Sequence, residues 1–228
     1  MELIILFLLY ILIKHWFEKI YYINIQDFIN IRWLIPKSRH RHQQPQMYYV
    51  DTDAEDTLGL THHYRGLRHR LWHSRFARDM LKLHNYVRAY HSAPPLVKSR
   101  RLNKIAQSYA EYLAATSTFQ HSGNQLGDES LGENLYMVWI SDGQVQTSPE
   151  EAVESWYQEI AMHDFDRPTY SPETGHFTQL VWGSTRKLGV GIAYSPNGNE
   201  VYIVANYYPA GNIVNPGYFE SNVLPPIY

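Results

Sequence analysis

The sequence LGVGIAYSPNGNEVYIVANYY, residues 188–208, contains two β-prone runs separated by a short loop. The runs cover residues 188–194 and 201–208, and the loop, residues 195–199, combines serine, proline, asparagine and glycine. Runs of this length around such a loop are typical of a β-hairpin. The sequence therefore predicts two neighbouring antiparallel strands in this region.

Three amphipathic helices are predicted upstream of the hairpin. Helical apolar spacing starts near Ser74 and ends before Pro94, because proline cannot continue a helix. The cleanest apolar stripe in the chain runs through residues 102–114 and predicts the second helix. The third helix starts after Ser148, which can form a capping box with Glu151, and a proline occupies the first helical position between them.

The order of these elements favours an α+β fold class. A further β-prone run, residues 134–140, lies between the second and third predicted helices. Helices precede the hairpin and do not alternate regularly with strands, which favours a small antiparallel sheet covered by helices over a doubly wound parallel sheet. We expect residues 75–228 to form this one domain.

The first 74 residues show a different pattern. Residues 3–13, LIILFLLYILI, form an apolar run that is too short to cross a hydrocarbon layer of roughly 30 Å. Residues 1–35 therefore have three interpretations: a short anchor, a signal-like segment, or a mis-assigned start with Met47 as a later one. Residues 36–74 combine prolines and charges with little apolar periodicity, which predicts a disordered linker.

Composition excludes several classes of function. The chain has no cysteine, so it has no disulfide framework, thiolate metal site or cysteine nucleophile, and this suits a reducing compartment. Its formal charge of −2 gives no reason to expect nucleic acid as a partner.

Polar residues interrupt apolar stretches in three short segments. These are Gly-Glu-Asn at 132–134, GHFTQLVWGST at 175–185, and YYPAGNI at 207–213. His121 follows the second predicted helix, and Glu159 lies on the inner face of the third. An HNxxR pattern in the first helix adds His84, Asn85 and Arg88.

The HNxxR pattern and the three polar segments, in their order along the chain, resemble the motifs of the CAP superfamily of cysteine-rich secretory, antigen 5 and pathogenesis-related proteins. The resemblance covers residues of about 75 to 215 and implies an α-β-α sandwich with a cleft that holds two histidines and two glutamates. The family site is reported to bind zinc or another divalent ion through its histidines, which are His121 and His176 here. The binding cleft that we expect contains six residues: His121, Glu133, Glu159, His176, Tyr208 and Asn212.

The chemistry of these residues fits a metal but does not require one. Neutral imidazole is a good Zn²⁺ ligand, and nearby carboxylates can orient the ligands or accept protons from bound water. The alternative is a polar network that ties the third helix to the sheet without metal. We expect no organic cofactor.

The absence of cysteine sets this chain apart from secreted members of the family. Those members usually carry a cysteine where this chain has Ala205, so the chain looks similar to the cysteine-free, Golgi-associated pathogenesis-related type. That subgroup attaches to cytosolic membrane faces through N-myristoylation, but Met1-Glu2 offers no acceptor glycine. We expect association with a cytosolic or Golgi membrane face, with secretion as the alternative.

The expected function is a non-enzymatic binding module for lipid, sterol, peptide or glycan at or near a membrane. One alternative is a metal-dependent, protease-like hydrolase with Glu133 or Glu159 as the base, although the chain has neither an HExxH nor a GxSxG motif. The other alternative is an oligomeric scaffold, for example a homodimer that covers the cleft.

Overall fold

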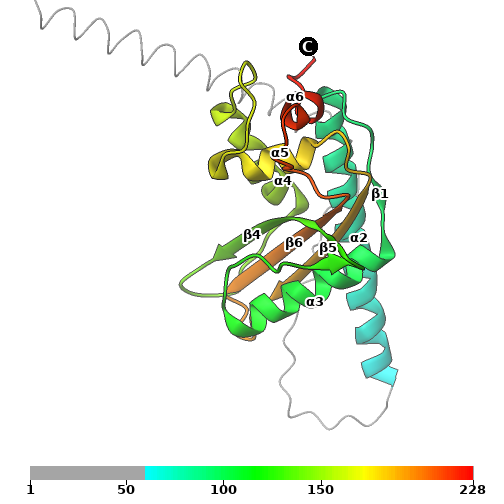
Figure 1. The fold of residues 1–228 in the computed structure, drawn as a ribbon. Coiled ribbons are helices and arrows are strands. Elements are labelled where there is room, and N and C mark those ends of the chain that lie inside the picture. Colours follow the sequence, from blue (N-terminus) through cyan, green and yellow to red (C-terminus); the bar gives the residue numbers. More distant parts are fainter. Residues whose placement is uncertain (1–59, 228) are drawn as a thin grey trace, which may run out of the picture. The chain divides into compact units, whose positions relative to one another are not determined.

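The structure, a computed structural model, describes residues 60–227 of the chain. Figure 1 shows how the elements are arranged. The helices are α2 (Leu60–Tyr90), α3 (Arg100–Thr116), α4 (Pro149–Tyr157), α5 (Gly175–Val181) and α6 (Tyr218–Asn222), with 3₁₀ turns η1 (Gln158–Met162) and η2 (Pro172–Thr174). The strands are β1 (Val97–Lys98), β2 (Gln125–Leu126), β3 (Glu129–Ser130), β4 (Gly132–Trp139), β5 (Lys187–Tyr194) and β6 (Glu200–Tyr208).

The main sheet has the strand order β1-β5-β6-β4. Strands β5 and β6 form the predicted antiparallel hairpin, and β4 pairs antiparallel with the other side of β6. The short strand β1 runs parallel to β5, so the sheet is antiparallel except at this edge. A separate two-stranded ribbon, β2 with β3, precedes β4.

Helices cover both faces of the main sheet, as expected for an α-β-α sandwich. Helix α3 packs on β5 and β6, while α2, α4 and α5 contact one another and the opposite face (Figure 1). The buried face of α3 is the predicted apolar stripe: Leu102, Ala106, Ala110, Leu113 and Ala114. Trp156 of α4 and Trp182 after α5 are 1% exposed and belong to the core. The fold class predicted from the sequence is confirmed.

The predicted start of the third helix is also confirmed. Ser148 caps α4, and its side chain accepts a hydrogen bond from the backbone N–H of Glu151 while the Glu151 side chain accepts one from the backbone of Ser148. The α-helix ends at Tyr157 and continues as the 3₁₀ turn η1. Glu159 lies in this turn, next to the N-terminus of α5.

Helix α2 begins at Leu60, and not near Ser74 as its apolar spacing predicts. The C-terminal part of the segment predicted as a disordered linker is therefore helical, and the sequence has no proline between Pro45 and Pro94 to stop a helix there. The interpretations of residues 1–35, and the rest of the linker, lie outside the described residues. The helices of residues 60–227 are too short or too polar to serve as transmembrane segments.

Candidate functional site

The first candidate pair joins His121 to Glu133 of β4. The Nδ1 atom of His121 lies 2.9 Å from Oε1 of Glu133, and the same carboxylate accepts hydrogen bonds from the Ser122 backbone and hydroxyl and from Asn206 Nδ2. The Glu133 side chain is only 6% exposed, whereas that of His121 is 65% exposed. The hydrogen bond to Glu133 raises the pKa of His121 above its ordinary value, although partial burial opposes this shift.

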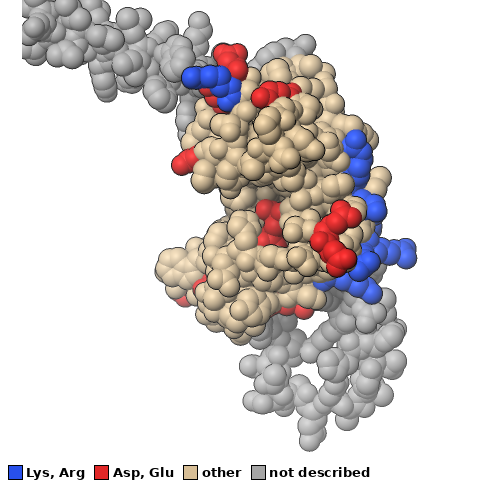
Figure 2. All heavy atoms as spheres, viewed as in Figure 1, with Lys and Arg blue, Asp and Glu red and all other residues tan. Residues whose placement is uncertain are grey.

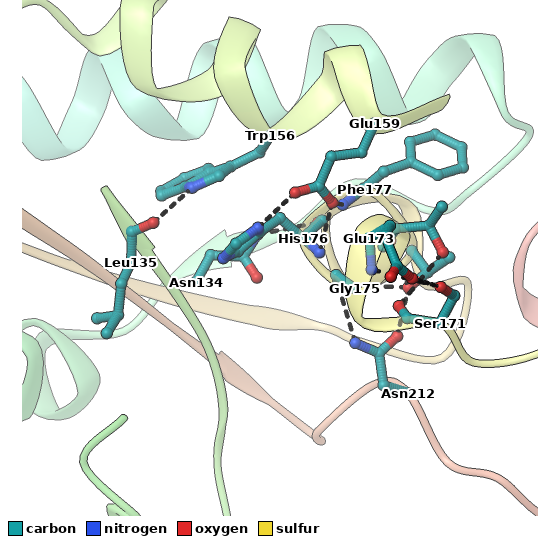
Figure 3. A network of polar contacts seen from close by, with 12 residues as sticks. Asn134, Leu135, Trp156, Glu159, Ser171, Glu173, Gly175, His176, Phe177 and Asn212 are labelled. Atoms are coloured by element: carbon teal, nitrogen blue, oxygen red, sulfur yellow. Dashed lines mark hydrogen bonds and ion pairs between the residues drawn. The ribbon is translucent and has the colours of Figure 1, made fainter. Parts of the chain in front are cut away.

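The second candidate pair joins His176 of α5 to Glu159 of η1 (Figure 3). The Nδ1 atom of His176 lies 2.6 Å from Glu159 Oε1, and Glu159 Oε2 accepts hydrogen bonds from the backbone N–H groups of His176 and Phe177. These N–H groups are unsatisfied donors of the first turn of α5, so Glu159 caps this helix from a distant element. The His176 ring stacks on Trp156 with 6.4 Å between centroids.

Strand β4 connects the two pairs. Asn134 follows Glu133 directly, and its Nδ2 donates to the carbonyl oxygen of His176 over 3.0 Å. Successive side chains of a strand point to opposite faces, so Glu133 and Asn134 project from opposite faces of this edge strand, and Asn134 contacts the backbone of His176 and not its ring. Figure 2 shows a hollow between the part that carries α4 and α5 and the part that carries the sheet, with acidic side chains inside it.

Among residues 73–227, whose side chains the structure describes, no three His, Cys, Asp or Glu side chains are grouped closely enough to hold a metal ion together. A site formed by all four predicted residues around one ion is therefore absent from the described part of the chain. The narrower prediction, a metal held by the two histidines in a shared cleft, stays a prediction.

The other two predicted cleft residues have different surroundings. Asn212 adopts a left-handed backbone conformation with φ 58°, and its side chain accepts a hydrogen bond from the Thr178 hydroxyl and donates one to the Gly175 carbonyl. It thus holds the helical turn that carries His176. The Tyr208 hydroxyl donates to Glu129, and Lys187 Nζ lies 5.3 Å from the centroid of its ring. The role of Tyr208 as a cleft wall stays a prediction.

Both pairs leave one imidazole nitrogen available. A carboxylate accepts hydrogen bonds only, so Nδ1 of each histidine carries the proton and donates to Glu133 or Glu159. In the neutral imidazole the lone pair then lies on Nε2, and neither Nε2 has a hydrogen-bond partner among the described residues. A carboxylate that fixes the other ring nitrogen is the usual partner of a metal-binding histidine. The donor set fits a divalent cation such as Zn²⁺.

A buried chain of hydrogen bonds connects Asn134, which contacts the second pair, to helix α2. Asn134 Nδ2 donates to the Tyr207 hydroxyl over 3.2 Å, and this hydroxyl donates to Nε2 of His84 over 2.8 Å. The Nδ1–H of His84 donates to the Met80 carbonyl one turn earlier in α2. Because His84 accepts at one ring nitrogen and donates at the other, this chain of hydrogen bonds requires it to be neutral.

Acid is expected to destabilise the protein through His84. Burial lowers the pKa of His84 to about 4, and the Arg88 cation adds to this shift while the hydrogen bond to Met80 opposes it. The unfolded value is about 6.5, so the stabilisation is complete above that pH and is lost as the pH falls towards 4. The expected loss in the free energy of unfolding is about 2 kcal/mol at about pH 5. Urea unfolding of the wild type and of His84→Gln would measure it, and equal pH dependence in both would contradict this assignment.

The sequence did not point to three residues that hold the site. Ser122 and Asn206 supply three of the hydrogen bonds to Glu133, and Thr178 fixes Asn212. Of the three, only Asn206 could have been found from the sequence, because it is a polar residue inside the apolar run that forms β6. A buried amide requires a hydrogen-bond partner, so its presence there indicates a polar contact.

Comparison with known proteins identifies the class to which this fold and site belong. The family model for CAP, the cysteine-rich secretory protein family, matches residues 81–207. The chain therefore belongs to the CAP family, as its motifs predict.

Among its relatives is the human Golgi-associated plant pathogenesis-related protein 1. The two are 44% identical over 151 residues, which cover 66% of this chain and 94% of the relative. Secreted protein RBT4 of Candida albicans is 33% identical over 161 residues, which cover 67% of this chain and 42% of that protein. The solved structure of BmVAL-1 shares the fold with a TM-score of 0.51 and 24% identity, covering 63% of this chain and 81% of the other. The relatives thus include Golgi-associated and secreted proteins.

Proposed function

We propose that this protein is a non-enzymatic binding module that engages a lipid, sterol, peptide or glycan at or near a membrane, and that His121 and His176 bind a divalent cation such as Zn²⁺. One observation carries the metal part: a glutamate fixes Nδ1 of each imidazole, while each Nε2 lacks a partner among the described residues. The membrane part is supported by the apolar run at residues 3–13 and by a relative named for its association with the Golgi.

An ion held by two imidazoles keeps coordination positions for water or for an oxygen of a ligand, and would polarise that oxygen when bound. The residues of the chain itself have a positioning role. Glu159 sets the orientation of His176 through the ring and through the backbone of α5. Glu133 orients His121, which projects into solvent where a ligand can reach it.

A hydrolase that uses Glu133 as its base is less well supported. Burial by itself raises the pKa of this carboxyl, but hydrogen bonds from His121, Ser122 and Asn206 outweigh burial and hold the pKa below its ordinary value. A general base works best when its pKa lies near the working pH. A carboxylate with these donors is better suited to holding a histidine in place than to accepting a proton from water.

Zinc titration of the full chain by calorimetry tests the metal site. We expect His121→Asn/His176→Asn to lose binding at the site by at least about 100-fold, and Glu159→Gln to weaken it by about 10-fold to 100-fold because His176 loses its orientation. The matched control is His62→Asn/His63→Asn, which also removes two imidazoles and should leave the affinity unchanged.

Two outcomes would contradict the proposal. Equal zinc affinity in the wild type and in His121→Asn/His176→Asn would dismiss a histidine-bound metal. Cleavage of a peptide library by the zinc-loaded wild type, abolished in Glu133→Gln or Glu159→Gln, would replace the binding module with a hydrolase.

A further inference from the structure

Exposed cations gather where the edge strand β1 meets the start of α3. Parallel pairing places Val97 beside Lys187 and Lys98 beside Leu188. Figure 2 shows Lys and Arg side chains concentrated along the side of the molecule on which β1 lies in Figure 1. The six exposed cations of these neighbouring segments, here called the basic face, are Lys98, Arg100, Arg101, Lys104, Arg186 and Lys187.

The six cations of the basic face form no salt bridge within the described part of the chain, although Figure 2 shows acidic side chains on the same side of the molecule. No ion pair joins any of the six cations to a carboxylate among residues 73–227, whereas three cations of α2, Arg75, Arg78 and Lys82, lie 3.5 to 3.7 Å from Asp79. The whole chain has a formal charge of −2, so this concentration does not follow from an excess of basic residues. The positive potentials of the six cations add together, so the basic face attracts an external anion.

The position of the cations on α3 also opposes helix stability. The first turn of α3 contains Arg100 and Arg101 and no acidic residue, although cations are unfavourable at the positive end of a helix dipole. Helix α4 of the same chain has the favourable arrangement, with Glu150 and Glu151 in its first turn. Stability therefore does not account for the cations at α3.

An exposed apolar side chain identifies the kind of partner. Val97 is 58% exposed and lies next to Lys98 in sequence and beside Lys187 across the strand pair. An exposed aliphatic side chain next to cations suits the boundary between anionic headgroups and acyl chains.

We propose that the basic face docks on the surface of a lipid bilayer that contains anionic lipids, with Val97 at the headgroup boundary. This inference rests on the membrane part of the proposed function and adds to it the class of lipid and the face that contacts it. This contact places the β1 edge of the sheet on the membrane. The opposite edge is formed by β4, which contacts the two His–Glu pairs, and it lies away from the membrane.

Vesicle flotation of the full chain tests this docking. The vesicles are phosphatidylcholine alone, or phosphatidylcholine with phosphatidylserine as a minor component. We expect Arg100→Gln/Arg101→Gln/Lys104→Gln to lower the partition coefficient on the anionic vesicles by about 100-fold, because each cation near such a surface contributes about 5-fold. High salt should reduce wild-type binding, since exposed charges are screened.

A matched control separates the basic face from net charge. Gln144→Glu/Gln146→Glu/Arg167→Gln changes the formal charge by the same amount, through two added carboxylates and one lost cation, at exposed positions away from the β1 edge. It should retain nearly all binding. The thermal midpoint of the α3 variant should equal or exceed that of the wild type, because it removes cations from the positive end of a helix.

Each result has a definite meaning. Equal loss of binding in the two variants would show that net charge alone acts, and would overturn the basic face. Wild-type binding that is equal on neutral and anionic vesicles would overturn the inference while leaving the membrane part of the proposed function in place. No flotation with either vesicle would overturn both.

Discussion

Replacing Arg88 with methionine is expected to lower the free energy of unfolding by about 4 kcal/mol. The Arg88 side chain is fully buried, and its guanidinium donates to the carbonyl oxygens of Pro94, Leu180, Trp182 and Thr185 over 2.7 to 3.1 Å. Methionine fills a similar space but leaves these buried carbonyls without donors, and each unsatisfied group carries a desolvation cost. Burial lowers the pKa of Arg88 only to about 10, so the side chain remains a cation at neutral pH.

The pattern of variants distinguishes hydrogen bonding from charge. Lysine keeps the cation but cannot reproduce the planar fork of the guanidinium, so Arg88→Lys should lose about 2 kcal/mol or more. Arg101→Met, at an exposed position of α3, is the control and should change stability by less than about 0.5 kcal/mol. Urea unfolding measures all three through the midpoint. A midpoint for Arg88→Met equal to that of the wild type would show that these carbonyl contacts contribute nothing to the fold.

Elements with a strong local signal were predictable from the sequence. The capping box at Ser148 and the loop at 195–199 depend on a few adjacent residues, and the structure has both. Strand β1 was not predictable, because a strand of two residues has no periodicity and its pairing with β5 joins distant segments. The early start of α2 was missed because polar residues within a helix give no apolar stripe to detect.

The candidate site was only partly accessible from the sequence. The resemblance to the CAP superfamily predicted its two histidines and two glutamates, and the structure pairs each histidine with one glutamate. Which glutamate serves which histidine depends on tertiary packing, because Glu159 reaches the start of α5 only after η1 turns the chain. The basic face was missed for the same reason: Lys98 and Lys187 become neighbours only through strand pairing.

Replacing Gly191 with alanine is expected to cost about 3 kcal/mol, although alanine is the smallest possible addition. A Cβ atom at Gly191 would lie 2.4 Å from the backbone carbon and oxygen of Ala106, and one at Gly189 would lie 2.2 Å from Leu102. These two glycines of β5 let α3 approach the sheet closely. The approach brings Gln107 within hydrogen-bonding distance of both backbone groups of Ile192, beyond the end of the short strand β1.

The clash at Gly191 is with backbone atoms, and this makes the prediction specific. Shortening the opposing side chain in Gly191→Ala/Ala106→Gly should restore no stability, because the carbonyl of residue 106 remains in place. Gly183→Ala is the control, since its nearest neighbours would lie at an ordinary 3.5 Å. Thermal or urea unfolding of the three variants would measure the effect. Rescue by the second substitution, or an unchanged midpoint in Gly191→Ala, would mean that α3 can move away from β5 at little cost, and that close packing of this helix on the sheet is not required.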